Sequence, residues 1–256
     1  MFRLHKWFFD CVTPQGEALV VYVATLRWGI VRLGYSATLS HRGGGTRSRT
    51  RIGRAPAPQR LDDGFALTVP RLDLRGTWRG ALRSQARELW RSPRGVVTWN
   101  CHLPSAEVEV QFAGRRLLGT GYVEHLALEV APWFLPIDEL RWGRWHGGGR
   151  SVVWIQWRGP HPLRLCLVDG EPVEAGPVED EGFDLGDGMQ LRLGAGTVLR
   201  TGELGRTVLA EHVLRWLPLP RAVKNMQETK WLARGTLIDG DATIDGAALH
   251  EVVRWA

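Results

Sequence analysis

Residues 106–130 read AEVEVQFAGRRLLGTGYVEHLALEV, and this stretch decides the fold class. Apolar residues alternate with polar ones on both sides of an AGR turn, which is typical of strands that bury one face. The glycine of the turn supplies the positive φ that a tight hairpin requires. The stretch therefore predicts two antiparallel strands joined by a short turn.

Strand signals of the same kind fill most of the chain. Runs rich in Val, Leu, Trp and Thr, separated by turns such as DDG, DG and GAG, cover residues 17–40, 64–78, 106–130, 151–158, 163–173, 183–202 and 206–219. Short strands at this spacing indicate an all-β antiparallel protein, built as a sandwich or a barrel. One segment, SQARELWRS (84–92), is predicted as a short helix with Ser84 as its N-cap. Repeated βαβ units are therefore not expected, and the glycine clusters are predicted as turns rather than phosphate-binding loops.

The composition is that of a soluble globular protein. The chain has 256 residues, of which 44% are hydrophobic and 23% are charged, enough for one large β domain or two smaller ones. Its three cysteines, Cys11, Cys101 and Cys166, lack disulfide or zinc spacing, so we expect reduced thiols. The opening MFRLHKWFFD has no apolar signal-peptide core, and no run reaches the roughly 18 apolar residues of a membrane helix. We therefore expect a cytoplasmic protein.

Arginine dominates the positive charge. The net charge is +6, and of 33 Lys and Arg residues only Lys6, Lys224 and Lys230 are lysines. Basic proteins gain affinity for nucleic acid by releasing counterions from phosphates. Most arginines here alternate with apolar residues, as in RLDLRGTWRGALR (71–83), and this alternation places them on the solvated face of a strand. Nucleic-acid binding is therefore the weakest functional hypothesis.

Residues 41–60, HRGGGTRSRTRIGRAPAPQR, contain six arginines and no acid. Their Gly, Ser and Pro content predicts a mobile loop. Two functional alternatives are a lid over a pocket and a peripheral contact to an anionic membrane surface, which attracts arginine-rich segments.

Thirteen tryptophans are an unusually high number for this length. Large aromatic side chains can fill the cores of β domains. Some can instead line an apolar cavity, because a barrel of about eight strands can enclose one small ligand. Both roles can apply to different tryptophans.

Tyr122, Glu124 and His125 place a phenol, a carboxylate and an imidazole close together in an apolar strand. Alternation puts Tyr122 and Glu124 on one face and His125 on the other, unless nearby glycines create a bulge. Structural roles are the alternative. Tyr122 would then be a core tyrosine, and Glu124 would pair with Arg141 or Arg144 to tie two domains together.

A metal site and a bound cofactor are not expected. His250 and Glu251 in ALHEVV are adjacent and so face opposite ways on a strand, and the segment lacks the second histidine of H-E-x-x-H. GDGDATIDG lacks the helices and the terminal glutamate of a calcium loop, so it is predicted as a hairpin turn.

Five segments match motifs of a known family. KWFFDCVTPQGEALVVYVATL (6–26) matches an opening W-[YF]-F-D-x-V-x-x-x-G, and VTWNCHLPSAEVEVQFAG (97–114) matches a segment with Trp and Pro ahead of an alternating strand. G-x-G-Y-x-[DE] is present at 119–124, and ETKWLARGTLIDG with ALHEVVRW matches the closing strands. In these segments the chain resembles the carotenoid 1,2-hydratase (hydroxyneurosporene synthase) family. The resemblance implies two consecutive lipocalin-like antiparallel β-barrel domains with few short helices, which we place at residues 1–120 and 121–256.

The site of that family resembles a His-x-Trp pair followed by a Tyr-x-Asp pair. Trp99, Tyr122 and Glu124 fall on three of these positions, while Val97 stands at the histidine position and Glu124 replaces an aspartate. The second change keeps an acid but moves it by one methylene. The resemblance thus implies that Tyr122 and Glu124 are catalytic and that Trp99 contacts the substrate.

Hydration or isomerisation of an isoprenoid double bond begins when an acid protonates the alkene to a carbocation. A Trp-lined apolar cavity would supply such an acid, since desolvation disfavours the carboxylate and raises the pKa of Glu124. Aromatic faces can then stabilise the cation by roughly 0.5 to 2 kcal/mol each. The candidate substrate-binding residues are Trp99, Trp133 and Trp142, together with His102 and His125, which could orient water or return the proton.

Three functional hypotheses follow. The first is a cofactor-independent enzyme that acts on a hydrophobic polyene or isoprenoid-like molecule by general acid catalysis, as a hydratase, isomerase or cyclase. A pericyclase that holds its substrate in one reactive conformer is a variant that needs no protonated acid. The second is a non-catalytic lipocalin-like carrier of an apolar metabolite, and the third is a nucleic-acid-binding protein that uses residues 41–60.

Overall fold

The computed structural model describes residues 1–81, 83, 85–203 and 226–255, and most of them lie in β-strands. Two antiparallel sheets account for these strands, which confirms the predicted all-β class. The chain divides into two compact units, Met1–Phe134 and Leu135–Ala256. The boundary that we placed after residue 120 falls inside β10 (Arg115–Leu128), whose second half pairs with β1 (Phe2–Val12) and so belongs to the first unit.

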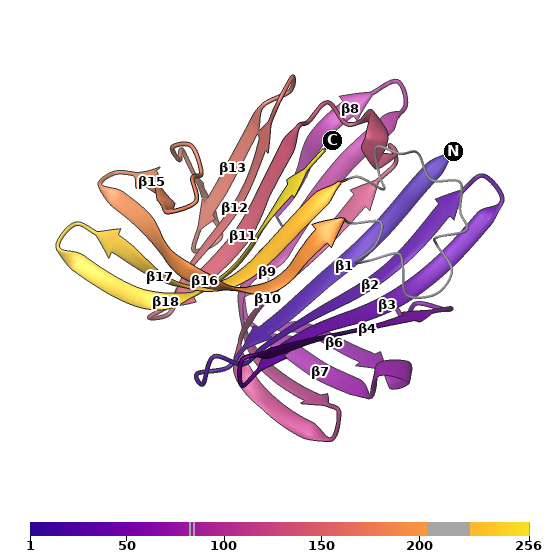
Figure 1. Cartoon of the computed structure of the whole chain (residues 1–256), viewed down its shortest axis with the longest axis horizontal. Coiled ribbons are helices and arrows are strands. Elements are labelled where there is room, and N and C mark those ends of the chain that lie inside the picture. Colours follow the sequence, from indigo (N-terminus) through magenta and orange to yellow (C-terminus); the bar gives the residue numbers. More distant parts are fainter. Residues whose placement is uncertain (82, 84, 204–225, 256) are drawn as a thin grey trace. The chain divides into compact units, whose positions relative to one another are not determined.

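The first unit is built on a ten-stranded antiparallel sheet (Figure 1). Its strands pair in the order β4-β3-β2-β1-β10-β9-β7-β6-β5, and β8 also pairs with β9. The other elements are β2 (Ala18–Trp28), β3 (Val31–Arg42), β4 (Gly45–Ile52), β5 (Gln59–Leu61), β6 (Gly64–Val69), β7 (Leu74–Arg79), β8 (Gln85–Ser92), β9 (Gly95–Phe112) and the 3-10 helices η1 (Pro70–Leu72) and η2 (Pro132–Phe134).

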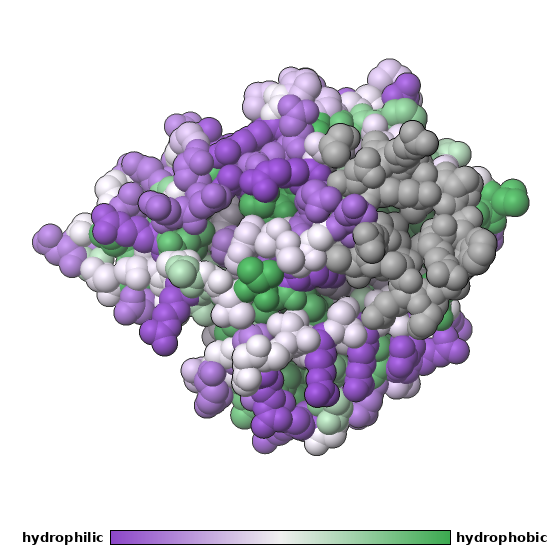
Figure 2. All heavy atoms as spheres, viewed as in Figure 1, coloured by the Kyte–Doolittle hydropathy of each residue, from purple (hydrophilic) through white to green (hydrophobic). Residues whose placement is uncertain are grey.

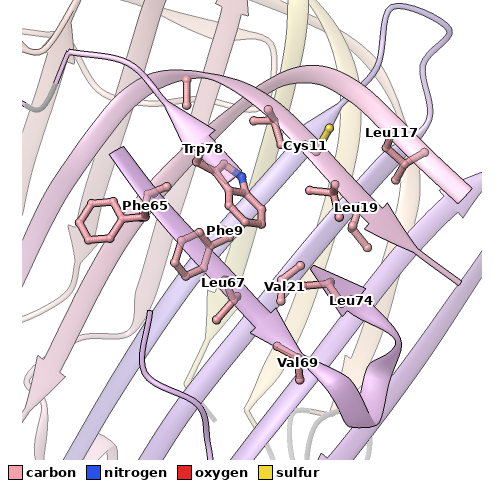
Figure 3. Close-up of a cluster of buried hydrophobic side chains, with 14 of the residues drawn as sticks. Phe9, Cys11, Leu19, Val21, Phe65, Leu67, Val69, Leu74, Trp78 and Leu117 are labelled. Atoms are coloured by element: carbon pink, nitrogen blue, oxygen red, sulfur yellow. The ribbon is translucent and has the colours of Figure 1, made fainter. Parts of the chain in front are cut away.

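Apolar side chains on one face of this sheet form the core of the first unit. Phe9 lies opposite Val21 on β2 and opposite Val123 on β10, so the three share a face. Figure 3 shows Phe9 and Trp78 pointing toward each other within the core cluster. The Trp78 indole is fully buried, and its Nε1 donates to the Asp10 carbonyl at 2.7 Å. We call the face that carries this core the inner face and the opposite one the outer face.

The second unit is built on an eight-stranded antiparallel sheet in the order β14-β13-β12-β11-β18-β17-β16-β15. Its elements are β11 (Glu139–Gly147), β12 (Arg150–Arg158), β13 (Leu163–Val168), β14 (Glu171–Val173), β15 (Gly182–Gly186), β16 (Met189–Glu203), β17 (Gln227–Asp239) and β18 (Ala242–Arg254). The core gathers around Trp145 and Trp154. The Trp145 Nε1 donates to the Gly235 carbonyl at 2.9 Å, so the buried indole has a hydrogen-bond partner.

The prediction of a helix at 84–92 is wrong, because the described part of this segment is a strand. Gln85–Ser92 is strand β8, which pairs with β9 from Gln85 opposite Cys101 to Ser92 opposite Gly95. The inter-strand hydrogen bonds of this hairpin override the helical pattern of the segment. The strand that we expected at 206–219 lies outside the described residues.

The arginine-rich segment 41–60 is not a simple loop. Residues 45–52 form β4, which pairs with β3 from Gly45 opposite Arg42 to Ile52 opposite Tyr35. The alternation of Arg with Ser and Thr in TRSRTR (46–51) is a strand pattern, which the surrounding Gly and Pro residues obscured.

Charged side chains cover the exposed parts of the strands. On the face shown in Figure 2, hydrophilic residues predominate and hydrophobic residues form small separate patches. Exposed ion pairs such as Arg79–Asp63 contribute little to stability, because water and salt screen them. Within the described ranges, no helix has the length and apolar character needed to cross a membrane.

Gly121 on β10 packs directly against β1, and the position leaves no room for a side chain. A Cβ there would lie 2.1 Å from the Asp10 carbonyl oxygen and 2.6 Å from Val108 Cγ2. We expect Gly121→Ala to lower the free energy of unfolding by about 1 to 3 kcal/mol, measured by urea denaturation, because the methyl group forces the strands apart. Gly45→Ala is the control, since a Cβ there meets only the Arg42 carbonyl oxygen at 3.6 Å. Equal effects in the two variants would contradict this prediction.

Candidate functional site

A buried carboxyl group on β10 is the centre of the candidate site. Glu124 is only 4% exposed, and its Oε2 accepts a hydrogen bond from the Tyr122 hydroxyl at 2.9 Å. The same oxygen accepts a hydrogen bond from the Trp99 indole Nε1. Trp99 and Tyr122 are 2% and 0% exposed, so three polar groups meet away from bulk solvent.

The pairing of β1, β10 and β9 brings these groups together. Glu124 lies opposite Phe8 on β1 and opposite Cys101 on β9. Trp99 lies opposite Leu126, two residues further along β10, so its indole is a diagonal neighbour of the carboxyl group. The structure therefore brings together Trp99 and Glu124 as the sequence predicted for these positions.

β9 bulges beside this site. Between the pairs Ala106–Gly121 and Cys101–Glu124, β9 advances five residues while β10 advances three, so β9 holds two extra residues. Bulges increase the local twist and re-aim side chains. The bulge that the glycines of β10 suggested is present in this ladder, but the extra residues belong to the neighbouring strand.

Aromatic rings and a thiol surround the carboxyl group. The Phe8 ring lies 6.0 Å from that of Tyr122 and 5.4 Å from that of Tyr22, edge-on to both. Burial raises the pKa of Tyr122 well above its ordinary value, so the phenol is neutral and can donate. Burial likewise raises the pKa of the Cys101 thiol, which hydrogen-bonds with Tyr122.

Asp10 is a further buried acid that the sequence hypotheses did not include. It is 0% exposed and lies two residues after Phe8 on β1, so alternation places it on the same outer face as Glu124. The signal that could have found it is an acid within the otherwise apolar run WFFDCV (7–12).

The histidines His102 and His125 lie on the inner face. The His102 ring stacks on Trp7 at 5.0 Å, and the His125 ring lies 4.7 Å from the same indole, which packs against the core. The predicted split between Glu124 on one face and His125 on the other is confirmed. Neither histidine shares the face on which the carboxyl group lies.

Both of these imidazoles are neutral at pH 7. Burial lowers the pKa of His102 to about 4, and the Arg60 charge adds to the effect. Burial also lowers the pKa of His125 to about 4, with smaller contributions from His5 and His102. A neutral imidazole can still donate one hydrogen bond and accept another.

The last two predicted site residues lie elsewhere in the chain. Trp133, in η2, contacts Phe2 and Trp28 edge-on, with ring centroids 5.8 and 5.3 Å away. Trp142 belongs to the second unit, on β11, where the Lys230 Nζ lies 5.1 Å from its ring centroid. Trp133 is thus part of an aromatic cluster in the first unit, and Trp142 carries a cation–π contact in the second.

Buried ion pairs in the second unit are polar groups that sequence reasoning missed. Lys230 is 1% exposed and donates to Glu251, while Glu228 is 3% exposed and accepts from Arg200 at 2.5 Å. Removing one partner of such a pair leaves an uncompensated buried charge. The sequence feature that could have revealed these ion pairs is the two-residue spacing of Glu228 and Lys230, which puts two opposite charges on one face of an apolar strand.

The second unit also contains a cavity of about 330 Å³. Its wall includes Trp154, Trp231 and His250, and the His250 ring stacks on Trp231 at 5.0 Å. Burial lowers the pKa of His250 to about 4, and Lys230 adds to the effect. Trp145, by contrast, is fully buried in the core, which confirms the core-filling role for this tryptophan, while the lining of an apolar ligand cavity stays a prediction.

The described part of the chain holds no group of three His, Cys, Asp or Glu side chains arranged to bind a metal ion. His250 and Glu251 lie opposite Trp231 and Lys230 and face opposite sides of β18.

Comparisons with known proteins identify the fold. No protein-family model and no curated protein matches the sequence. Three similar solved structures are each 12% identical to this chain: AttH from Nitrosomonas europaea (TM-score 0.55, covering 100% of this chain and 93% of that one), kievitone hydratase from Nectria haematococca (0.57, 98% and 88%) and CghA with Sch210972 (0.62, 99% and 89%). At this identity the likeness shows the fold, two consecutive lipocalin-like β domains. Membership of the carotenoid hydratase family stays a prediction.

Proposed function

We propose that this chain is a cofactor-independent enzyme that acts on a hydrophobic polyene or isoprenoid-like molecule, with Glu124 as its general acid. One observation carries the proposal: the Glu124 carboxyl group is buried, and its Oε2 is held by the Trp99 indole and the Tyr122 phenol. Two hydrogen bonds to one oxygen fix the orientation of the carboxyl group, and a general acid must be held in a fixed orientation toward its substrate.

In the proposed reaction the acid protonates a carbon–carbon double bond. The proton that is transferred is the one carried by the Glu124 carboxyl group. Its transfer breaks the O–H bond, forms a C–H bond with the alkene electron pair, and leaves a carbocation and a carboxylate. The rings of Trp99, Tyr122 and Phe8 would stabilise that cation.

The fate of the cation sets the product, and in each case the carboxylate regains its proton. Attack by water followed by proton loss gives hydration, loss of a different proton gives isomerisation, and attack by a second double bond followed by proton loss gives cyclisation. The name of kievitone hydratase indicates that a protein with this fold adds water to a small molecule, which supports hydration among the three.

A carrier of apolar metabolites is the second candidate. The observation that favours it is the cavity of the second unit, whose wall combines the aromatic rings of Trp154 and Trp231 with charged side chains such as Arg141. A carrier would bind such molecules without changing them.

Product formation separates these functions. We would incubate the protein with linear polyenes and isoprenoid alcohols and follow the mixtures by liquid chromatography and mass spectrometry. Hydration adds the mass of one water, while isomerisation and cyclisation keep the mass and change the retention time. The proposal expects product in molar excess over protein. Saturable binding of the same compounds with no product would support the carrier instead.

A further inference from the structure

A cavity of about 410 Å³ lies in the first unit, at the hairpin of β3 and β4. The charged residues of its wall are Glu17, Arg42, Arg47, Arg49 and Arg115. Four guanidinium groups and one carboxylate give these residues a net charge of +3. Such a wall attracts an anion more strongly than a neutral molecule.

Arg47 and Arg49 lie on the inner face of the sheet. Arg47 is opposite Ser40 on β3, and Arg49 is opposite Thr38, which in turn is opposite the core residue Val21. Alternation along β4 therefore puts both arginines on the side that carries the core. Both side chains are exposed, so they lie where the inner face opens to solvent beside the core.

Among the residues that the structure describes, no acidic side chain pairs with these two arginines. Glu17 accepts from Arg115 Nη2 at 3.1 and 2.9 Å and lies 3.0 Å from Arg42 Nε, so its carboxylate is already engaged. The guanidinium groups of Arg47 and Arg49 form no hydrogen bond or ion pair within the described ranges. With respect to the described residues, both guanidinium groups therefore keep their N–H donors available for a planar oxyanion.

The cavity combines this charge with apolar surface. Its wall includes Leu117, which is buried in the core, and Phe112, which packs against the core. Figure 3 shows Leu117 and Leu19 at the same end of the core cluster. We propose that the cavity binds an amphipathic organic anion, with its carboxylate, phosphate or sulfonate group against Arg47 and Arg49 and its apolar body against Leu117 and Phe112.

This site is separate from the Glu124 site, which lies on the outer face. It also gives a role to the arginine-rich segment 41–60, which takes no part in the proposed reaction. Charged side chains that point inward can have another purpose, because they stop an edge strand such as β4 from pairing with another chain. Edge protection requires charge but no binding, so a binding experiment distinguishes the two roles.

Two fluorescent probes that differ by one sulfonate group test the proposal. 8-Anilinonaphthalene-1-sulfonate carries a sulfonate, and N-phenyl-1-naphthylamine has the same rings without it. We expect the double variant Arg47→Gln, Arg49→Gln to weaken binding of the sulfonate about tenfold and to leave binding of the neutral probe within about twofold. The sulfonate affinity of the wild-type protein should also fall as salt is raised.

A matched control removes the same charge elsewhere. Arg27 and Arg32 are exposed and lie opposite each other at the other end of the β2–β3 hairpin. Arg27→Gln, Arg32→Gln should leave both probes unaffected. The proposal is overturned if the cavity variant binds the sulfonate as tightly as wild type, if both probes weaken together, or if the control variant weakens the sulfonate equally.

Discussion

Replacing Glu124 with glutamine is expected to lower turnover of the true substrate by about 10²- to 10⁴-fold, the usual contribution of a general acid. The amide keeps the size of the side chain, and its oxygen can still accept from Trp99 and Tyr122. It has no acidic proton to give to an alkene. Substrate affinity should change little, so the loss should appear in kcat and not in KM.

Glu129→Gln is the matched control for this prediction. Glu129 follows β10 closely in sequence, and its side chain is 47% exposed. Its Oε1 lies 3.8 Å from the Arg3 Nε. It should retain wild-type turnover. Wild-type turnover in Glu124→Gln would remove the acid role and favour a pericyclase that acts by holding its substrate in one conformer.

Acidification from about pH 6.5 toward pH 4.5 is expected to destabilise the fold. His102, His125 and His250 have a folded-state pKa of about 4, below the ordinary value of 6.5. Between these values the unfolded chain binds more protons than the folded one, so the free energy of unfolding falls as the pH falls. The stabilisation is complete above pH 6.5 and is lost toward pH 4. We expect a loss on the order of 1 kcal/mol per histidine after solvent screening, measured by urea denaturation at several pH values.

His102→Phe tests the origin of this slope. A phenyl ring can keep the stack on Trp7 and cannot be protonated. The variant should show a smaller pH dependence between pH 6.5 and 4.5, by about one histidine's contribution. His161→Phe, at an exposed position, should follow the wild-type curve. If His102→Phe also followed it, protonation of His102 would have no part in acid destabilisation.

The fold class and part of the site could be predicted from local sequence. Alternation in residues 106–130 indicates β9 and β10 because each strand buries one face, and the same two-residue period places Tyr122 and Glu124 together. The family resemblance added Trp99, whose indole donates a hydrogen bond to the Glu124 carboxyl group. These features depend on spacing along a strand, which the sequence displays directly.

Other features depend on which strands pair, which local sequence does not display. Residues 85–92 have a helical composition and become β8 only because β9 lies beside them. His102 shares the inner face with Trp7, and its closeness in sequence to Trp99 did not show this because β9 bulges between Cys101 and Ala106. The domain boundary was misplaced for the same reason, since the end of β10 pairs back onto β1.

The two extra residues of β9 bear on how relatives of this chain are recognised. They lie between Cys101 and Ala106, and the ladder is regular on either side, so a chain without them could still place Trp99 opposite Leu126. The number of residues between Trp99 and Tyr122 can therefore differ by two among relatives while both side chains still reach the carboxyl group of residue 124. A search motif that fixed this interval would miss such chains, and an alignment should place its gap within residues 102–105.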